Sequence, residues 1–232
     1  MAVIWGFDLS EMSWSAFEHR RMFEKRWYLR RERFIIYQLA MLIALAAECT
    51  ATYALAKYEF LQSNIGRLSG HTASLHSNDI RAAAILTIVF CVFVATLFGA
   101  DFFFLLFWPK RRYPRWYDMT KKAIAVWICL GVGAAAIMST IVVAMNEAYI
   151  SGVGDRTAIE LVDSYPRPPL VYRTFPQNIA WVVLLWLALI PTISSTMLMF
   201  KSSVHDSRYG TMPKNIIDLN DAGDVGPPRH EE

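Results

Sequence analysis

Cysteine, glycine and proline are scarce in this 232-residue chain, and their scarcity excludes several classes of protein. There are three cysteines, 11 glycines and 10 prolines. So few cysteines exclude a disulfide-stapled scaffold, and so little glycine and proline excludes a collagen-like chain and disfavours a wholly disordered one. Charged residues make up 19% of the chain and are nearly missing from long stretches, whereas apolar and aromatic residues make up 55%. This distribution disfavours a soluble domain.

Four apolar runs account for 95 residues and are too long for ordinary core helices. The shortest has 22 residues, and at about 1.5 Å per residue such a helix exceeds the roughly 30 Å hydrocarbon thickness of a bilayer. We therefore predict an all-α fold, a four-transmembrane-helix bundle of the plasma membrane or an endomembrane. The predicted spans are residues 34–56, 82–108, 123–145 and 179–200.

Lysine and arginine are concentrated on one side of the predicted membrane domain. Residues 1–33 hold seven, residues 109–122 hold six and residues 201–232 hold four, against six in the other two connections. By the positive-inside rule, this 17-to-6 distribution predicts that both termini are cytoplasmic. We accordingly expect a basic N-terminal segment (1–33), a four-span membrane domain (34–200) and a disordered cytoplasmic tail (201–232).

The basic N-terminal segment is predicted to form an amphipathic helix that runs into the first span. No glycine or proline interrupts residues 7–65, and Phe23, Trp27 and Phe34 fall near one helical face with bases around them. Two interpretations of the bases remain open: they bind anionic lipid headgroups of the cytoplasmic leaflet, or they only fix the topology as snorkelling arginines. The bases concerned are Arg20, Arg21, Lys25, Arg26, Arg30, Arg31 and Arg33.

Two acids lie within the predicted spans, where an ionisable side chain is a candidate functional site. Glu48 is about 21 Å from the cytoplasmic end of its span and Asp101 about 10 Å from the same face, so they are not expected to pair. The hydroxyl residues at matching depths are Ser139 and Thr140 for Glu48, and Ser194 and Ser195 for Asp101.

The two acids admit a structural and a functional interpretation. Glu48 either is protonated or hydrogen-bonded inside the bundle, where it fixes helix register, or forms a proton or cation site. For Asp101 the structural interpretation is favoured, because Lys121 or Lys122 can reach it from the cytoplasmic side. In the third span Gly131, Ala135 and Ser139 form a series of small residues that allows close helix approach.

The outer connections carry little chemistry. Residues 57–81 are expected to form a short polar loop, and residues 146–178 contain apolar residues at helical spacing after Asp155, which predicts a short helix. His71 and His76 are a poor metal signal without further ligands, and all three cysteines fall inside spans. The chain has no nucleotide-binding, hydrolase or zinc motif. We predict no catalytic residue, metal or cofactor, and no nucleic-acid partner.

Four spans, cytoplasmic ends, small outer loops and a basic turn between the second and third spans resemble tetraspan proteins of the MARVEL type. More loosely they resemble the claudin-like groups, including fungal eisosomal proteins. Claudin-like proteins carry a tryptophan signature and paired cysteines in the first outer loop, whereas residues 57–81 contain neither Trp nor Cys. The resemblance implies a role in membrane organisation or vesicle trafficking.

The expected function is therefore non-enzymatic contact with the lipid bilayer and with other membrane proteins or a second copy. Such a protein organises a membrane domain, assists trafficking or serves as an accessory subunit of a membrane complex. A small transporter or channel that uses Glu48 is the alternative, and an integral-membrane enzyme comes third.

Overall fold

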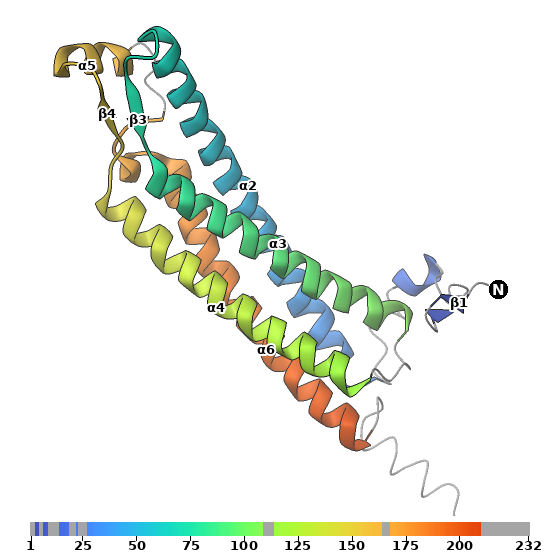
Figure 1. The fold of residues 1–232 in the computed structure, drawn as a ribbon. Coiled ribbons are helices and arrows are strands. Elements are labelled where there is room, and N and C mark those ends of the chain that lie inside the picture. The colour runs from blue at the N-terminus through green and yellow to red at the C-terminus, as the bar shows by residue number, and fades with distance from the viewer. Residues whose placement is uncertain are drawn as a thin grey trace, which may run out of the picture.

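Four long helices form the body of the protein in the computed structural model, which describes residues 3–4, 7–8, 14–18, 22, 27–108, 114–163 and 168–209. They run side by side as an elongated bundle (Figure 1). Each holds a stretch long and apolar enough to cross a membrane, which confirms the predicted helical fold with four candidate spans. The four helices are α2 (Arg30–Leu68), α3 (Asn78–Phe107), α4 (Arg115–Met145) and α6 (Pro176–Tyr209).

The order of the helices around the bundle decides which residues can meet. Helix α2 packs against α3 and α6, and α4 packs against the same two helices. Helices α2 and α4 therefore lie diagonally opposite each other. We call the end at which α2 and α4 begin the basic end, and the opposite end the cap end.

A small folded cap covers the cap end (Figure 1). Strand β3 (Ser74–His76) pairs antiparallel with β4 (Tyr149–Ser151), which joins the two outer connections in a sheet that was not predicted. Helix α5 (Asp155–Asp163) confirms the short helix predicted in the second connection. The cap also holds the 3₁₀ turn η3 (Tyr172–Thr174).

Helix α2 is longer than its predicted span and replaces much of the predicted outer loop. It continues to Leu68, whereas the span was expected to end at residue 56 and a loop to follow. The added turns bury Tyr58, Leu61 and Ile65 beneath the cap. Their spacing of three and four residues is that of an amphipathic helix, so the signal was present in a segment read as polar loop.

The predicted helix from the N-terminal segment into the first span is wrong where the structure describes it. Residues 27–29 form a turn, and Leu29 has a φ of 52°, a left-handed conformation that interrupts a helix. Before that turn lie two paired short strands, β1 (Val3–Ile4) and β2 (Phe7–Asp8), and a 3₁₀ turn, η2 (Trp14–Phe17). Phe17 packs edge-on against Phe107 at a centroid distance of 5.9 Å, which places η2 at the end of α3.

Helix α6 also runs past its predicted end at residue 200. It continues to Tyr209, so residues 201–209 are helical and do not belong to a disordered tail. Ser202 is buried in this extension, which brings α6 into the packing at the basic end. The remaining tail, 210–232, lies outside the described residues.

Small residues line the interior of the bundle and let the helices approach closely. Helix α2 buries an alanine stripe that follows the helical period. On α4, Gly131, Ala135 and Ser139 are all buried, as their spacing predicted. The ring of Phe90 from α3 occupies the place where a Cβ on Gly131 would stand. The buried stripe of α2 consists of Ala40, Ala44, Ala47, Ala51 and Ala54.

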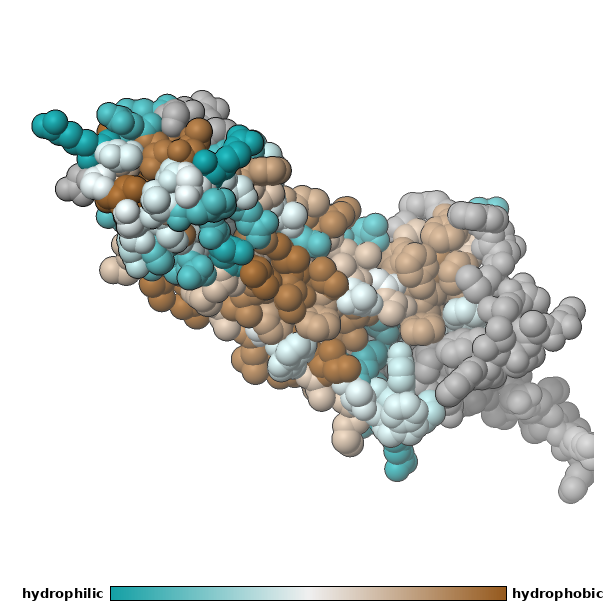
Figure 2. Space-filling model, turned by 45° about the horizontal axis from the view of Figure 1, so that its top comes forward, coloured by the Kyte–Doolittle hydropathy of each residue, from teal (hydrophilic) through white to brown (hydrophobic). Residues whose placement is uncertain are grey.

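The outer surface of the bundle is apolar along its middle. Figure 2 shows, on one face of the molecule, brown side chains along the rod and a teal group over the cap. Large apolar residues such as Leu42, Leu130 and Ile190 are more than half exposed on three different helices. An apolar band between two polar ends is the surface expected of a bundle that faces lipid.

Candidate functional site

The most elaborate polar site is a buried ion cluster at the basic end, centred on Asp101 of α3. Arg33 of α2 donates from Nη2 to Asp101 Oδ2 at 2.8 Å. Lys121 of α4 donates from Nζ to Asp101 Oδ1 at 2.7 Å. The three side chains are only 6–12% exposed. The carboxylate therefore ties three helices together.

The same arginine extends the cluster to the fourth helix. Arg33 Nη1 donates to Ser202 Oγ at 2.9 Å, and Ser202 in turn donates to Asp206 Oδ2 at 3.2 Å, both on α6. Arg33 Nε donates to the hydroxyl of Tyr37 at 3.3 Å. The guanidinium thus has a partner for each of its donor nitrogens. We call Arg33, Tyr37, Asp101, Lys121, Ser202 and Asp206 the four-helix cluster.

The chemistry of the four-helix cluster is that of buried ion pairs that hold the four helices in one arrangement, a role we call a structural lock. Two bases and two acids offset one another in a small volume, so no single charge is left uncompensated. A buried ion pair adds little net stability relative to apolar packing, but removal of one partner is strongly destabilising because it strands a charge. A cluster with such geometry specifies which helices pack together, and at which register.

The structure brings together part of what was predicted around Asp101. Lys121 reaches it as expected, while Lys122 instead pairs with Asp118, one turn away on α4. The serines expected near Asp101 are not its partners. Ser194 donates to the carbonyl of Ile190 on its own helix, and Ser195 is buried without a hydrogen-bond partner among the described residues.

Glu48 and its expected partners lie apart. Ser139 shares a hydrogen bond of 3.4 Å with Thr87 of α3, and Thr140 accepts one of 3.0 Å from Trp186 of α6. Because α2 and α4 are diagonal, residues at one depth on these helices do not meet. Glu48 has no hydrogen bond or ion pair with any residue that the structure describes.

Two of the seven bases assigned to lipid headgroups are buried instead. Arg33 belongs to the four-helix cluster, and Arg30 is only 4% exposed. Arg30 donates to the carbonyl of Leu106 at 3.5 Å and stacks over the ring of Phe34. Arg31 is exposed and available to headgroups. The other four, Arg20, Arg21, Lys25 and Arg26, lie outside the described residues.

A second polar network joins the cap to the helices, and sequence reasoning missed it. Asp79, in the first turn of α3, accepts from Tyr172 at 2.7 Å and from the Asn146 side chain at 2.8 Å. Burial, and after it this hydrogen bond, hold the pKa of the Tyr172 hydroxyl well above its usual value. Asn178 of α6 donates to the Tyr58 hydroxyl at 3.0 Å. These partners are up to 120 residues apart, so no local pattern could have revealed them.

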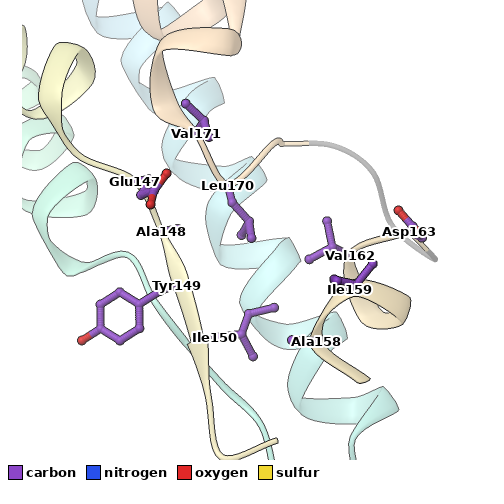
Figure 3. A pocket seen from close by; sticks show the side chains of 10 residues that line it. All are labelled: Glu147, Ala148, Tyr149, Ile150, Ala158, Ile159, Val162, Asp163, Leu170 and Val171. Atoms are coloured by element: carbon purple, nitrogen blue, oxygen red, sulfur yellow. The ribbon is translucent and has the colours of Figure 1, made fainter. Parts of the chain in front are cut away.

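An open cavity of about 390 Å³ lies in the cap between β4, α5 and residues 170–171. Figure 3 shows the side chains of Ile150, Val162 and Leu170 turned toward it from these segments. Two acids, Glu147 and Asp163, also line it. The cavity is mainly apolar, and no cluster of three or more metal-ligating residues occurs among the described residues.

The comparisons with known proteins add no family to this description. No family model, no curated protein and no solved structure matches the chain. Its class rests on its own features: four helices able to span a membrane, joined by a buried ion cluster at one end and a folded cap at the other.

Proposed function

We propose that this chain is a multi-pass membrane protein that acts by contact and not by chemistry. Its role is that of a membrane-domain organiser, a trafficking factor or an accessory subunit of a membrane complex. The resemblance to MARVEL-type tetraspan proteins supports the same role. Both termini are cytoplasmic in this proposal, which puts the four-helix cluster at the cytoplasmic face.

The four-helix cluster is the observation that carries the proposal. Its central ion pairs join Asp101 to Arg33 and Lys121 at 2.7–2.8 Å, and these three side chains are almost fully buried. Intramembrane ionisable groups that mark an ion or proton pathway commonly face a water-filled cavity. A bundle whose charges at the basic end are paired with one another presents its apolar outer surface and its polar ends to other molecules.

Anionic lipids of the cytoplasmic leaflet are the proposed lipid partners. Because Arg30 and Arg33 are buried, the proposal assigns the headgroup contact to the other five N-terminal bases, of which the structure describes Arg31, an exposed residue. Each base near an anionic leaflet contributes about 1 kcal/mol. This attraction is reduced by salt, since exposed charges are screened over about 10 Å at 0.1 M ionic strength.

A small transporter or channel is the second candidate, favoured by the unpartnered carboxyl of Glu48. The two candidates predict different results for purified protein in liposomes. An organiser produces no proton or cation flux above that of protein-free liposomes. Flux that is present in the wild type and lost in Glu48→Gln would overturn the contact proposal.

The contact proposal also predicts assembly in the native membrane. Protein extracted directly into polymer-bounded lipid discs should be found in particles that hold more protein mass than one chain. The mass of single particles measures this. Discs that contain one chain alone at native expression levels would contradict the proposal.

A further inference from the structure

Of the two acids in the apolar spans, Glu48 is the one that forms no hydrogen bond or ion pair with any described residue. Its side chain is half-buried on the flank of α2 that faces α3, near Cys91. None of the four apolar runs contains a lysine or arginine, so no cation of these runs can reach it. A carboxyl group facing hydrocarbon without a hydrogen-bond partner is costly. Since no described residue supplies a partner, Glu48 is open to one from outside this chain.

The surface around Glu48 is open and suited to another helix. Leu45 and Thr52, which lie three residues before and four after Glu48 and so share its side of the helix, are both exposed. Thr52 is small, which allows two helices to come close at that point. Ala46 is equally exposed but lies on a different side of α2.

We propose that Glu48 pairs with Glu48 of a second copy of this chain, across a two-fold interface formed by the α2 faces. A protonated carboxyl both donates and accepts, so it is complementary to itself. Two copies inserted with the same topology hold Glu48 at the same depth, and a two-fold axis along the membrane normal brings like residues together. A cationic helix from another protein would need a base at this depth, and nothing in the chain implies one.

This inference rests on the proposed function and names a second copy as one partner. It also accounts for a half-buried carboxyl that has no partner among the described residues of a single chain. Hydrogen bonds between membrane helices are modest in strength. Loss of the carboxyl should weaken dimerisation about tenfold, equivalent to about 1.4 kcal/mol.

Disulfide trapping of the full chain in its membrane tests the interface. In a Cys49→Ser background, Thr52→Cys should form a covalent dimer on mild oxidation, because like positions next to the axis come within disulfide range. Ala46→Cys is the matched control on the same helix and should remain monomeric. Equal trapping at the two positions, or no trapping at Thr52→Cys, would overturn the proposal.

A matched pair of substitutions tests the role of Glu48 itself. In the Thr52→Cys chain, Glu48→Gln keeps a donor and an acceptor and should still be trapped, whereas Glu48→Met keeps the length and should be trapped about tenfold less. Unchanged trapping in Glu48→Met would overturn the carboxyl pairing. If Glu48→Met does not fold, the contrast between Thr52→Cys and Ala46→Cys still decides the interface.

Failure of the Glu48 pairing can be told apart from failure of the proposed function. Ion flux abolished in Glu48→Gln would defeat the contact proposal, whatever the trapping result. Absence of trapping, combined with larger assemblies in lipid discs, would defeat only the pairing of two copies. A heteromeric particle with a basic helix opposite Glu48 would likewise overturn the pairing.

Discussion

At the scale of single residues, the polar side chains of the bundle differ chiefly in whether the fold supplies their partners. Asp101 meets two cations and Glu48 meets none within the described residues. The sequence predicted that Lys121 can reach Asp101, because the depth of a residue in a helical span follows from the number of residues to the end of that span. It could not predict which helices are neighbours, and for that reason the pairing of Glu48 with Ser139 and Thr140 failed.

Loss of the Asp101 charge should destabilise the protein strongly. Asp101→Asn leaves Arg33 and Lys121 buried without a counter-charge, which costs about 3–5 kcal/mol. Asp118→Asn is the control, since Asp118 and Lys122 are 31% and 23% exposed and such pairs contribute about 0.2–1 kcal/mol. Unfolding of both variants in the same detergent measures the difference. Similar losses in the two variants would show that the four-helix cluster is not a structural lock.

The hydroxyl of Tyr172 should make stability fall at alkaline pH. Because its folded pKa is raised, the folded state keeps the proton while the unfolded state releases it above pH ~10. The stabilisation is complete below that pH and is lost as pH rises toward the folded pKa. The unfolding temperature, measured from about pH 9 to about pH 11 around the reference tyrosine pKa of ~10, should fall more steeply with pH for the wild type than for Tyr172→Phe. Parallel declines would contradict this assignment.

At the scale of secondary-structure elements, periodicity predicted most of the helices and little of their ends. The apolar runs identified the cores of α2, α3, α4 and α6, and spacing identified α5. The added turns of α2 and α6 are amphipathic and carry polar residues, so a hydropathy window ends too early. The β3–β4 sheet was not predictable locally, because Leu75 and Ile150 pair across 75 residues of chain.

Two glycines on α4 should respond in opposite ways to the same substitution. Gly131→Ala places a methyl group on the ring of Phe90 and should cost about 1–3 kcal/mol through overpacking. Gly133→Ala meets no atom within 4 Å. It should be neutral or stabilise by up to about 1 kcal/mol, since alanine is the better helix former. Unfolding midpoints that shift in the same direction would contradict the close packing of α3 and α4.

At the scale of the whole molecule, the described part of the protein is a rod (Figure 1) with an apolar middle, buried ion pairs at the basic end and a folded cap end. By the positive-inside rule, the distribution of bases predicts that the basic end lies in the cytoplasm. In that orientation the cap, built from the two connections with few bases, faces the opposite side. Surfaces at both ends and along the apolar sides are available for contact.

The most direct test of this account is the position of its two ends relative to the membrane. In a chain without its native cysteines, Arg115→Cys marks the basic end and Arg156→Cys marks α5 of the cap; both positions are exposed. A membrane-impermeant maleimide is applied to intact cells, then after digitonin opens the plasma membrane, and then after detergent opens every membrane.

If the basic end is cytoplasmic, Arg115→Cys should first be labelled at the digitonin step. Arg156→Cys should be labelled either already in intact cells or only after full detergent, depending on the membrane in which the protein resides. Labelling of Arg115→Cys in intact cells, or of both positions together at the digitonin step, would contradict the four-span topology with a cytoplasmic basic end.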